Sequence, residues 1–572
     1  GAANVANDGR LFIRGGDASE ARMYIDGMLV SNPYSASVPN LPARTRFQPG
    51  LFKGAFFSTG GYSAEYGQAL SSVLVLNSID WPRREQTDVH FSSVGAGGRT
   101  TIVGDGRALT IAGDYVNLYP YHHVFSEQDI WDKSPENKNV NASYRRQIGR
   151  AGLLKVYAHG ESGQARIWQE IPGSNSGPEQ YGMDNDYGLL QSTYRYAGEK
   201  SVITAGISYS ENREAANAGT SSAHHRNRTL HAKSTIIYLL SDNHSLNSGA
   251  ELEVTSFRQR LYGSDRQRLS RKYQDEHYFI WSEMESSVTP SISVRSGLRW
   301  GYSRLTGDHW VLPRVSAAWR PGTRGQWSVA AGRYHQMAVP NIRVAAPLLE
   351  GAESEHLLVN YFFQKEGRTI RVEGFYKTYR QLPLFEGTEY QPHTIRADGR
   401  GFARGADVFY RDRVSVRNTE FWATYQWIDS KRSTGNHVDR ITPSFAPEHN
   451  ASLVIKHFIR PLRSQLGLTF SWNNGYPYMS PNDPENTSLR TSSFFDISVG
   501  WSYLPRSNMI VHLASSNIFG RDHVFGYRYA DQSDASGFIP SLPVQSVTPR
   551  FLYAGIFITF SGGNAANMFN NF

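Results

Sequence analysis

The sequence predicts an all-β membrane protein in which about 22 antiparallel strands close into a transmembrane β-barrel, with a small N-terminal α+β plug in the lumen. Three observations predict this fold. Apolar and polar side chains alternate with a period of two, tight turns alternate with long polar connections, and aromatic residues are frequent in a chain of low mean hydropathy.

The alternation is clearest in two segments near the C-terminal end. In residues 465–472 and 495–503, apolar side chains occupy every second position. These positions are Leu466, Leu468, Phe470 and Trp472 in the first segment, and Phe495, Ile497, Val499, Trp501 and Tyr503 in the second. Because successive side chains of a strand point to opposite faces of a sheet, this period indicates strands with one apolar face. A large sheet must also hide its two edges, and closure into a barrel does so.

The composition agrees with a barrel in a membrane. Aromatic residues make up 13% of the 572 residues, yet the mean hydropathy is −0.48. A run of roughly 18 apolar residues is absent, so we expect no transmembrane helix. A membrane barrel combines these properties because only the lipid-facing half of each strand is apolar. The alternative is a soluble propeller or sandwich array, but a propeller should repeat a shared signature about every 40 residues, and the sequence has no such repeat.

Charge and cysteine content argue against several other classes. The chain has no cysteine, which excludes a disulfide framework, a thiolate metal site and a cysteine nucleophile. The formal net charge is +8, but the basic residues are scattered, so we expect no nucleic-acid partner. Serine, histidine and acidic residues form no cluster with a recognisable catalytic spacing. We therefore expect no enzyme, no catalytic residue, no cofactor and no metal site.

The first 80 residues differ from the rest of the chain. Glycine is frequent there, and residues 30–49 form a turn-rich stretch with four prolines. Short apolar runs at residues 11–13, 23–25 and 73–76 predict strands of a small mixed sheet. We therefore divide the chain into a plug domain (1–80), a transmembrane barrel (81–560) and a C-terminal tail (561–572).

Turns and loops set the expected number of strands. Short turns are predicted near residues 105–106, 148–150, 198–200, 242–244, 289–290, 321–325, 366–368, 411–413, 460–463 and 505–507. Longer connections are predicted between them, including residues 119–137, 171–186, 335–351, 382–399, 430–447, 476–489 and 517–548. About ten short turns and eleven loops imply about 22 strands, with the short turns on the periplasmic side. A lumen of that width would leak solutes, so a plug is expected on physical grounds.

The first 80 residues contain motifs in a characteristic order. Residues 12–16 read Phe-Ile-Arg-Gly-Gly, residues 24–27 read Tyr-Ile-Asp-Gly, and residues 60–67 read Gly-Gly-Tyr-Ser-Ala-Glu-Tyr-Gly. In order and spacing they resemble the plug motifs of TonB-dependent outer-membrane receptors. The last predicted strand, residues 550–560, ends in an aromatic residue, as does the final strand of that family. The resemblance covers essentially the whole chain.

The chain departs from the family pattern in three places. The family plug begins some tens of residues earlier and follows an energy-coupling segment, so we expect the N-terminal part of the plug to be absent here. Leu70, Ser71, Ser72 and Val73 stand where the family usually has a Gly-Gly pair. The tail also continues past the last strand.

The resemblance implies a function. It suggests a receptor in the outer membrane of a Gram-negative bacterium that binds a scarce solute and passes it to the periplasm, driven by a TonB-type energy coupler. Outer-membrane lipid and lipopolysaccharide are expected partners, and a surface lipoprotein or other outer-membrane protein is a further candidate. The alternative is a receptor-derived barrel that serves as a structural partner in a larger outer-membrane complex. A passive porin would not need residues 1–80, and an enzyme would need a catalytic cluster.

The resemblance also suggests a latch between plug and barrel. Arg14 is the plug candidate, and its expected partners are Glu373 and Glu420, which the alternation of their strands places on the inner face. Two other interpretations stay open: these charges are simply solvated in the lumen, or Arg14 pairs with Asp26 inside the plug. The wider set of plug-motif candidates is Arg14, Gly15, Gly16, Asp26, Gly27, Glu65, Tyr66 and Gly67.

Aromatic residues near strand ends are expected to form belts at the two membrane interfaces. The candidates are Trp300, Trp427, Trp472, Trp501 and Tyr503. Ligand-binding residues cannot be assigned from the sequence, because the loops that would carry them have no interpretable pattern.

Overall fold

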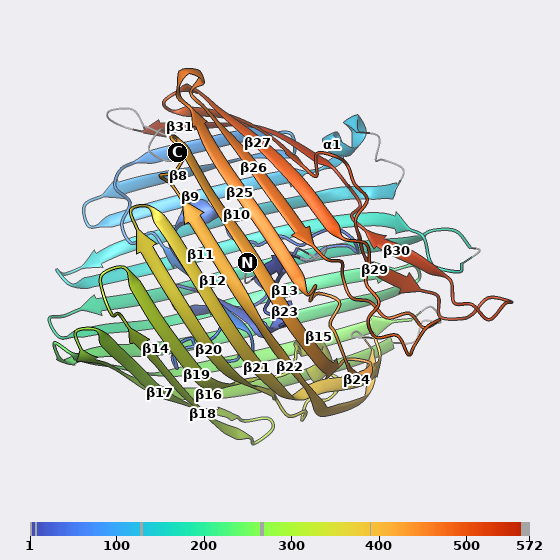
Figure 1. The fold of residues 1–572 in the computed structure, drawn as a ribbon, viewed down its shortest axis with the longest axis horizontal. Coiled ribbons are helices and arrows are strands. Elements are labelled where there is room, and N and C mark those ends of the chain that lie inside the picture. Colours follow the sequence, from blue (N-terminus) through green and yellow to red (C-terminus); the bar gives the residue numbers. More distant parts are fainter. Residues whose placement is uncertain are drawn as a thin grey trace.

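The computed structural model describes residues 3–5, 9–125, 130–174, 176–263, 268–388 and 391–561. Within these residues, 22 antiparallel strands form a closed barrel (Figure 1), which confirms the predicted fold class. The barrel closes where β31 (Phe551–Ser561) pairs with β7 (Gln86–Ser92), so the predicted last strand is also confirmed. Residues 562–572 of the predicted tail lie outside the described residues.

The remaining barrel strands follow one another around the wall. They are β8 (Gly95–Gly104), β9 (Arg107–Asn117), β10 (Trp131–Ile148), β11 (Gly152–Gln169), β12 (Glu179–Ala197), β13 (Ser201–Ala218), β14 (Ser221–Ser241), β15 (His244–Tyr262), β16 (Arg268–Thr289), β17 (Ile292–Ser303), β18 (His309–Trp319), β19 (Gly325–Gln336), β20 (Ala352–Lys365), β21 (Arg368–Gly387), β22 (Pro392–Asp412), β23 (Thr419–Thr434), β25 (His449–Ile459), β26 (Ser464–Asn473), β27 (Phe494–Arg506) and β28 (Met509–Ser516).

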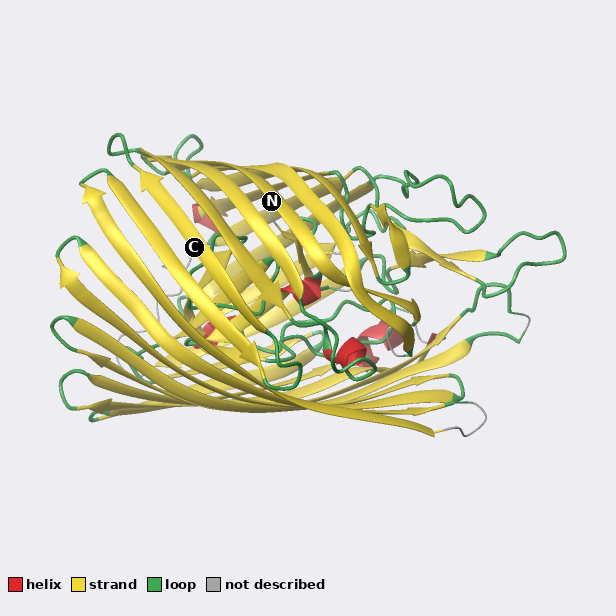
Figure 2. Ribbon diagram, turned by 90° about the horizontal axis from the view of Figure 1, so that it is seen from below, coloured by secondary structure: helices red, strands yellow, loops and turns green. Residues whose placement is uncertain are grey.

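The two ends of the barrel differ, as Figure 2 shows. The predicted short turns all lie at one end, within a few residues of their expected positions, and we call it the turn end. The other end, the loop end, carries the long connections. These contain α1 (Tyr119–Val124), α2 (Pro340–Arg343), the short strand β24 (His437–Ile441) and a hairpin of β29 (Val524–Tyr529) and β30 (Ser541–Gln545). In the part of the chain described, none of the helices has the length and apolar character needed to cross a membrane.

One predicted loop is wrong. Residues 382–399 belong mostly to β21 and β22, which keep pairing through irregular positions such as Leu382–Gly399 and Leu384–Arg396. Their polar sequence suggested a loop, but hydrogen bonding between neighbouring strands satisfies the backbone whether or not the side chains face lipid. The predicted loops at 119–137 and 171–186 are likewise shortened, because β10 and β12 begin within them.

Residues 9–80, which we call the plug, form a four-stranded sheet in the order β4-β3-β6-β5. Its strands are β3 (Ala21–Ile25), β4 (Met28–Val30), β5 (Phe52–Ser58) and β6 (Ser72–Ser78), and β3 and β6 are parallel. A short strand, β2 (Leu11–Ile13), pairs with β1 (Ala3–Val5), and single 3₁₀ turns occur at Ala18–Glu20 and Pro49–Leu51. The predicted strands at 11–13, 23–25 and 73–76 coincide with β2, β3 and β6.

The plug packs against the inner wall of the barrel. Its strand β4 contacts β12, β13 and β14. One apolar cluster joins Met23, Ile25 and Val30 of the plug to Tyr157 and Leu189 of the wall. The core of this protein therefore lies inside the barrel, between plug and wall, while the outer apolar face is left for lipid.

Candidate functional site

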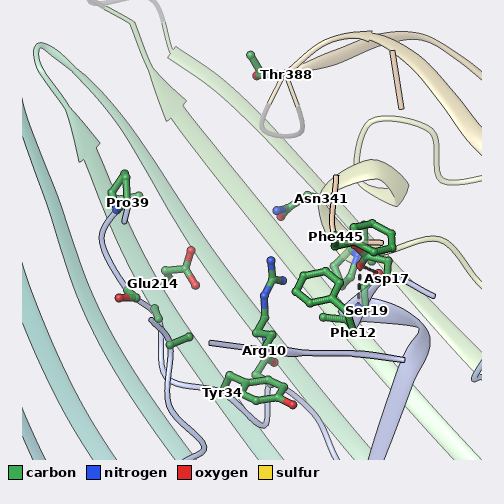
Figure 3. A pocket seen from close by; sticks show the side chains of 18 of the residues that line it. Arg10, Phe12, Asp17, Ser19, Tyr34, Pro39, Glu214, Asn341, Thr388 and Phe445 are labelled. Carbon is green, nitrogen blue, oxygen red and sulfur yellow. Dashed lines mark hydrogen bonds between the residues drawn. The ribbon is translucent and has the colours of Figure 1, made fainter. Parts of the chain in front are cut away.

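A cavity of about 1680 Å³ opens at the loop end of the barrel, and we call it the outer cavity. Plug residues 30–41 form much of its floor, while β12–β16 and several loop-end connections form its walls. In Figure 3, Arg10, Phe12 and Tyr34 of the plug project into this space, with Glu214 of β13 and Thr388 of a loop-end connection around it. The plug thus separates the cavity from the turn end.

Aromatic rings gather in pairs along one side of the outer cavity. Phe12 of the plug stacks on Phe445, with ring centroids 4.7 Å apart. Tyr478 lies in the connection after β26 and Tyr527 in the one after β28, and their ring centroids are 4.8 Å apart. Burial raises the pKa of the neighbouring Tyr476 to about 12, so its hydroxyl stays protonated even in alkaline solution. These flat surfaces and neutral hydroxyl groups suit a polar ligand with apolar faces.

Two buried arginines that line the outer cavity form ion pairs with acidic residues. Arg343 of α2 is buried and forms an ion pair of 2.6 Å with Asp275 of β16. Arg432 of β23 forms an ion pair with Glu20 of the plug. Because these charges are already compensated, the cavity favours recognition by hydrogen bonds and aromatic contacts over strong attraction for one sign of charge.

Arg14, the predicted plug residue of the latch, lies in a buried acidic site on the wall. Its guanidinium forms ion pairs with Glu373 of β21 and with Asp407 of β22, the latter at 2.8 Å. The ring of Phe375 covers it at 4.7 Å. Arg14 is 2% exposed and has a φ of +52°, so the turn directs the guanidinium to the wall at a conformational cost. Asp407 was missed, although its alternation with the lipid-facing Val408 would have placed it on the inner face.

Glu420, the other predicted partner of Arg14, does not contact it, so this expectation is wrong. Glu420 instead pairs with Arg411 and Arg413 near the turn end. In the register of β22 and β23, Asp407 lies opposite Gln426. Glu420 lies six residues before Gln426 in β23, toward the turn end, which corresponds to about 20 Å along the strand. Alternation indicates which face a side chain occupies, but not its height in the barrel.

The alternative pairing of Arg14 with Asp26 is also wrong. Asp26 and Gly27 form the β3–β4 turn with φ values of +50° and +83°. The Asp26 carboxylate accepts a hydrogen bond of 2.9 Å from the backbone N–H of Ser78 and forms an ion pair of 3.2 Å with Lys155 of β11. It therefore ties the turn both to the end of the plug sheet and to the wall.

The motif at residues 60–67 also contacts the wall through several groups. Glu65 forms an ion pair of 2.8 Å with Lys233 of β14, whose ammonium group lies 4.6 Å from the ring centroid of Tyr66. Gly67 is packed so closely that a Cβ there would lie 2.5 Å from Nε of Arg299. Glycine at position 67 therefore leaves the space that the Arg299 guanidinium occupies.

Two wall arginines that the sequence analysis did not single out hold this motif by its backbone. Arg299 of β17 donates a hydrogen bond of 3.0 Å to the carbonyl of Glu65 and pairs with Glu251. Arg314 of β18 donates one of 2.8 Å to the carbonyl of Tyr66. Alternation along β17 and β18 predicts that both side chains point into the barrel. Every residue has a backbone carbonyl, so the sequence does not indicate which carbonyls these arginines bind.

Gly15 and Gly16 complete the turn after Arg14. Gly15 has a φ of +68° and its carbonyl accepts a hydrogen bond from Arg432. A Cβ on Gly16 would lie 2.3 Å from Oγ of Ser71 and 2.8 Å from Oε2 of Glu20. Arg432 holds Glu20 in place, and the Ser71 hydroxyl donates a hydrogen bond of 2.8 Å to the carbonyl of Ile13, so both neighbours are held.

We expect Gly16→Ala to destabilise the plug by about 1–3 kcal/mol, because the added methyl group overpacks a buried site. The measurement is amide hydrogen exchange of residues 11–20, which should become faster. Gly54→Ala is the matched control, since a Cβ on Gly54 in β5 has no neighbour within 4 Å. Equal exchange in the two variants would contradict this account.

The predicted belt residues lie near both rims of the barrel. Trp501 and Tyr503 stack 5.8 Å apart close to the turn end. Trp300, Trp427 and Trp472 lie closer to the loop end of their strands. Trp319 and Trp327, which are 50% and 46% exposed, form a further cross-strand pair at the turn end that the sequence analysis did not include. A role for these residues as anchors in the membrane stays a prediction.

Comparison with known proteins gives a likeness in structure alone. No protein-family model matches the chain, and no curated protein sequence matches it. The ferric yersiniabactin uptake receptor FyuA from Yersinia pestis matches with a TM-score of 0.75 and 12% identity over 98% of this chain and 93% of that chain.

Two further solved structures agree. The ferric citrate transporter FecA matches with a TM-score of 0.73 and 12% identity over 98% of this chain and 92% of that one. The siderophore receptor PiuA from Acinetobacter baumannii matches with a TM-score of 0.73 and 11% identity over the same shares. By its architecture, this chain has the fold of the TonB-dependent outer-membrane receptors.

Proposed function

We propose that the protein is a receptor in the outer membrane of a Gram-negative bacterium that binds a scarce solute in the outer cavity and passes it to the periplasm. The observation that carries this proposal is the floor of the cavity. A separate sheet, held to the wall by ion pairs, closes a lumen that would otherwise be open. Binding above such a plug and displacement of the plug below it would together move a solute in one direction.

The contacts between plug and wall suit displacement by an applied force. Ion pairs of Arg14, Glu20 and Glu65 join the plug to β21, β22, β23 and β14 of the wall. Once water reaches these charges, hydration replaces much of what each pair contributes. The apolar contacts of Met23 and Ile25 with the wall still resist movement of the plug, so a shift needs an applied force. By resemblance, we propose a TonB-type coupler as the source of the force, and lipid and lipopolysaccharide as the surroundings of the barrel.

The test is native mass spectrometry of the full chain purified in a mild detergent. We expect a small molecule to remain bound, and we expect Phe445→Ala and Tyr478→Ala to lose it because they remove rings from the cavity wall. Trp319→Ala, on the outer surface at the turn end, is the matched control and should retain the molecule.

A structural partner in a larger outer-membrane complex is the second candidate function. Its support is the size of the loop-end connections, in particular the β29–β30 hairpin, which lies outside the barrel wall. Copurification of a stoichiometric protein with no small molecule in the cavity would favour this role over transport. A surface lipoprotein is one such partner.

A further inference from the structure

Four cationic side chains form a continuous row across the outer face of β13–β16, near the loop end of the barrel. In cross-strand order they are Arg213, Arg226, Arg258 and Lys272, and each lies directly opposite the next. Residues next to them in the chain, such as Asn212, Asn227 and Tyr273, are buried on the inner face. Because side chains alternate along a strand, the four cations point outward. We call them the basic row.

The basic row is unfavourable for the barrel alone, because like charges directly opposite each other destabilise a sheet. At two other places on the outer face, the strand register puts opposite charges together. Arg333 of β19 lies opposite Glu355 of β20, with an ion pair of 3.2 Å. Arg404 of β22 lies opposite Asp429 of β23, with an ion pair of 2.9 Å. An anion from outside the chain would offset the repulsion within the basic row.

Carboxylates compensate only one end of the basic row. Glu211 of β13 is shared by three arginines. Its ion pairs are 2.5 Å to Arg213, 2.7 Å to Arg226 and 3.0 Å to Arg228 of β14. Asp186 of β12 lies opposite Arg213 at the same end. Two acidic residues therefore serve this part of the outer face.

The other end of the basic row has no acidic partner. Between described residues, Arg258, Lys272 and the neighbouring Arg260 of β15 form no ion pair. The Nε atom of Arg260 is also buried without a hydrogen-bond partner there. We call the basic row together with Arg228 and Arg260 the basic patch. Its six cations face two carboxylates, so most of its charge is left uncompensated.

The basic patch begins where the apolar outer face ends. Tyr209, Leu230 and Val254 form the last apolar cross-strand row of β13, β14 and β15 on the way to the loop end. The basic row lies four residues beyond them, about 13 Å along the tilted strands. Short turns mark the periplasmic side of outer-membrane barrels, so the loop end faces the cell surface. The patch therefore lies at the level of the lipid headgroups of the outer leaflet.

Neutral hydrogen-bonding groups lie among the cations. Ser256 and Gln274 are opposite each other, between the apolar row and the basic row. His224 lies opposite Arg260, on the far side of the basic row. Such groups suit the hydroxyl groups of sugars. The basic row also crosses four strands, about 14 Å, which is more than one phosphate group occupies. These features fit a glycolipid that carries several phosphates.

We propose that the basic patch binds the phosphate groups of lipopolysaccharide in the outer leaflet. Guanidinium groups hold phosphate oxygens through paired, charge-assisted hydrogen bonds, and here the phosphates take the place of the missing carboxylates. The sugar headgroup then meets Ser256 and Gln274, while the acyl chains lie against Leu230 and Val254. The patch is on the outside of the barrel and separate from the outer cavity, so the proposal goes beyond the receptor function.

The test is a titration of the full chain, in an uncharged detergent, with lipopolysaccharide that lacks its long outer polysaccharide. Native mass spectrometry gives the bound fraction. The patch variant combines Arg226→Gln, Arg258→Gln and Lys272→Gln. We expect it to bind the lipid at least ten times more weakly than the unaltered chain, because half of the cations of the patch are lost. Without lipid, it should unfold at a higher temperature, because the like-charge repulsion is removed.

The matched control combines Arg333→Gln, Arg380→Gln and Arg404→Gln. It removes the same charge from the outer face, but each of these arginines pairs with a carboxylate, either Glu355 or Asp429. It should bind lipopolysaccharide as the unaltered chain does. A second comparison uses lipopolysaccharide from which the phosphates have been removed. The unaltered chain should bind this lipid at least ten times more weakly than the intact one.

Four results would overturn the site. Equal affinity of the patch variant and the control would mean that the patch does not hold the lipid. Equal binding of intact and dephosphorylated lipopolysaccharide would mean that phosphate is not recognised. Stronger retention of phosphatidylglycerol would assign the patch to a phospholipid. A lower unfolding temperature of the patch variant would mean that these cations stabilise the barrel by themselves. None of these results affects retention of a small molecule in the outer cavity, so the site can fail while the receptor function stands.

Discussion

Replacing Arg14 with methionine is expected to loosen the leading turn of the plug by about 3–5 kcal/mol. The substitution keeps the apolar contact with Phe375 but leaves Glu373 and Asp407 buried without a cation. Uncompensated carboxylates either take up protons or draw in water, and both responses separate the turn from the wall. The measurement is amide hydrogen exchange of residues 11–16 and 58–60, which should become at least a hundred times faster.

Glu420→Gln is the matched control for Arg14→Met. It also breaks ion pairs of a carboxylate on the inner wall, but Glu420 is 27% exposed and its partners are Arg411 and Arg413. Exposed pairs contribute about 0–1 kcal/mol, so exchange in the plug should stay close to that of the unaltered chain. A triple variant that adds Glu373→Gln and Asp407→Asn to Arg14→Met should recover part of the protection, because neither partner of Arg14 is then a carboxylate without its cation. Equal exchange in Arg14→Met and Glu420→Gln would rule out the latch.

Deletion of residues 1–80 is expected to raise passive permeability by about tenfold or more, because a barrel of this width encloses an aqueous lumen once its plug is removed. The barrel should still assemble. Its backbone hydrogen bonds run between neighbouring strands, and its apolar outer face meets lipid with or without the plug. Wall charges such as Lys233 and Asp407 would become hydrated in the open lumen.

The measurement is vesicle swelling with sugars of increasing size, together with single-channel conductance. Circular dichroism and heat-dependent mobility in detergent gels show whether the shortened chain has formed a barrel. Arg14→Met in the full chain serves as the comparison, because it loosens one contact and should raise permeability far less than the deletion. A folded barrel without residues 1–80 that is no more permeable than the full chain would contradict a plug in the lumen.

The fold followed from local patterns that every strand repeats. Alternation in segments such as residues 465–472 indicated strands with one apolar face, and the turns between them gave the number of strands. Both signals are short in range, because the direction of a side chain depends only on its own strand. The loop at 382–399 was mispredicted for the same reason, since pairing between two polar segments has no local signal.

The latch shows where local patterns reach their limit. Alternation placed Glu373 and Glu420 on the inner face, yet only Glu373 contacts Arg14. The height of each residue in the barrel depends on the register between strands and on where the plug lies. Contacts made through the plug backbone, such as those of Arg299 and Arg314, have no sequence signature at the position that accepts the hydrogen bond.

The sequence by itself determined that this protein is a wide barrel with an apolar exterior and a distinct N-terminal segment, because strand periodicity and turn spacing are properties of neighbouring residues. Only the tertiary structure decided which wall residues hold the plug and where the outer cavity lies. These features depend on distances between residues hundreds of positions apart, and such distances are set by barrel closure and by the packing of the plug against the wall.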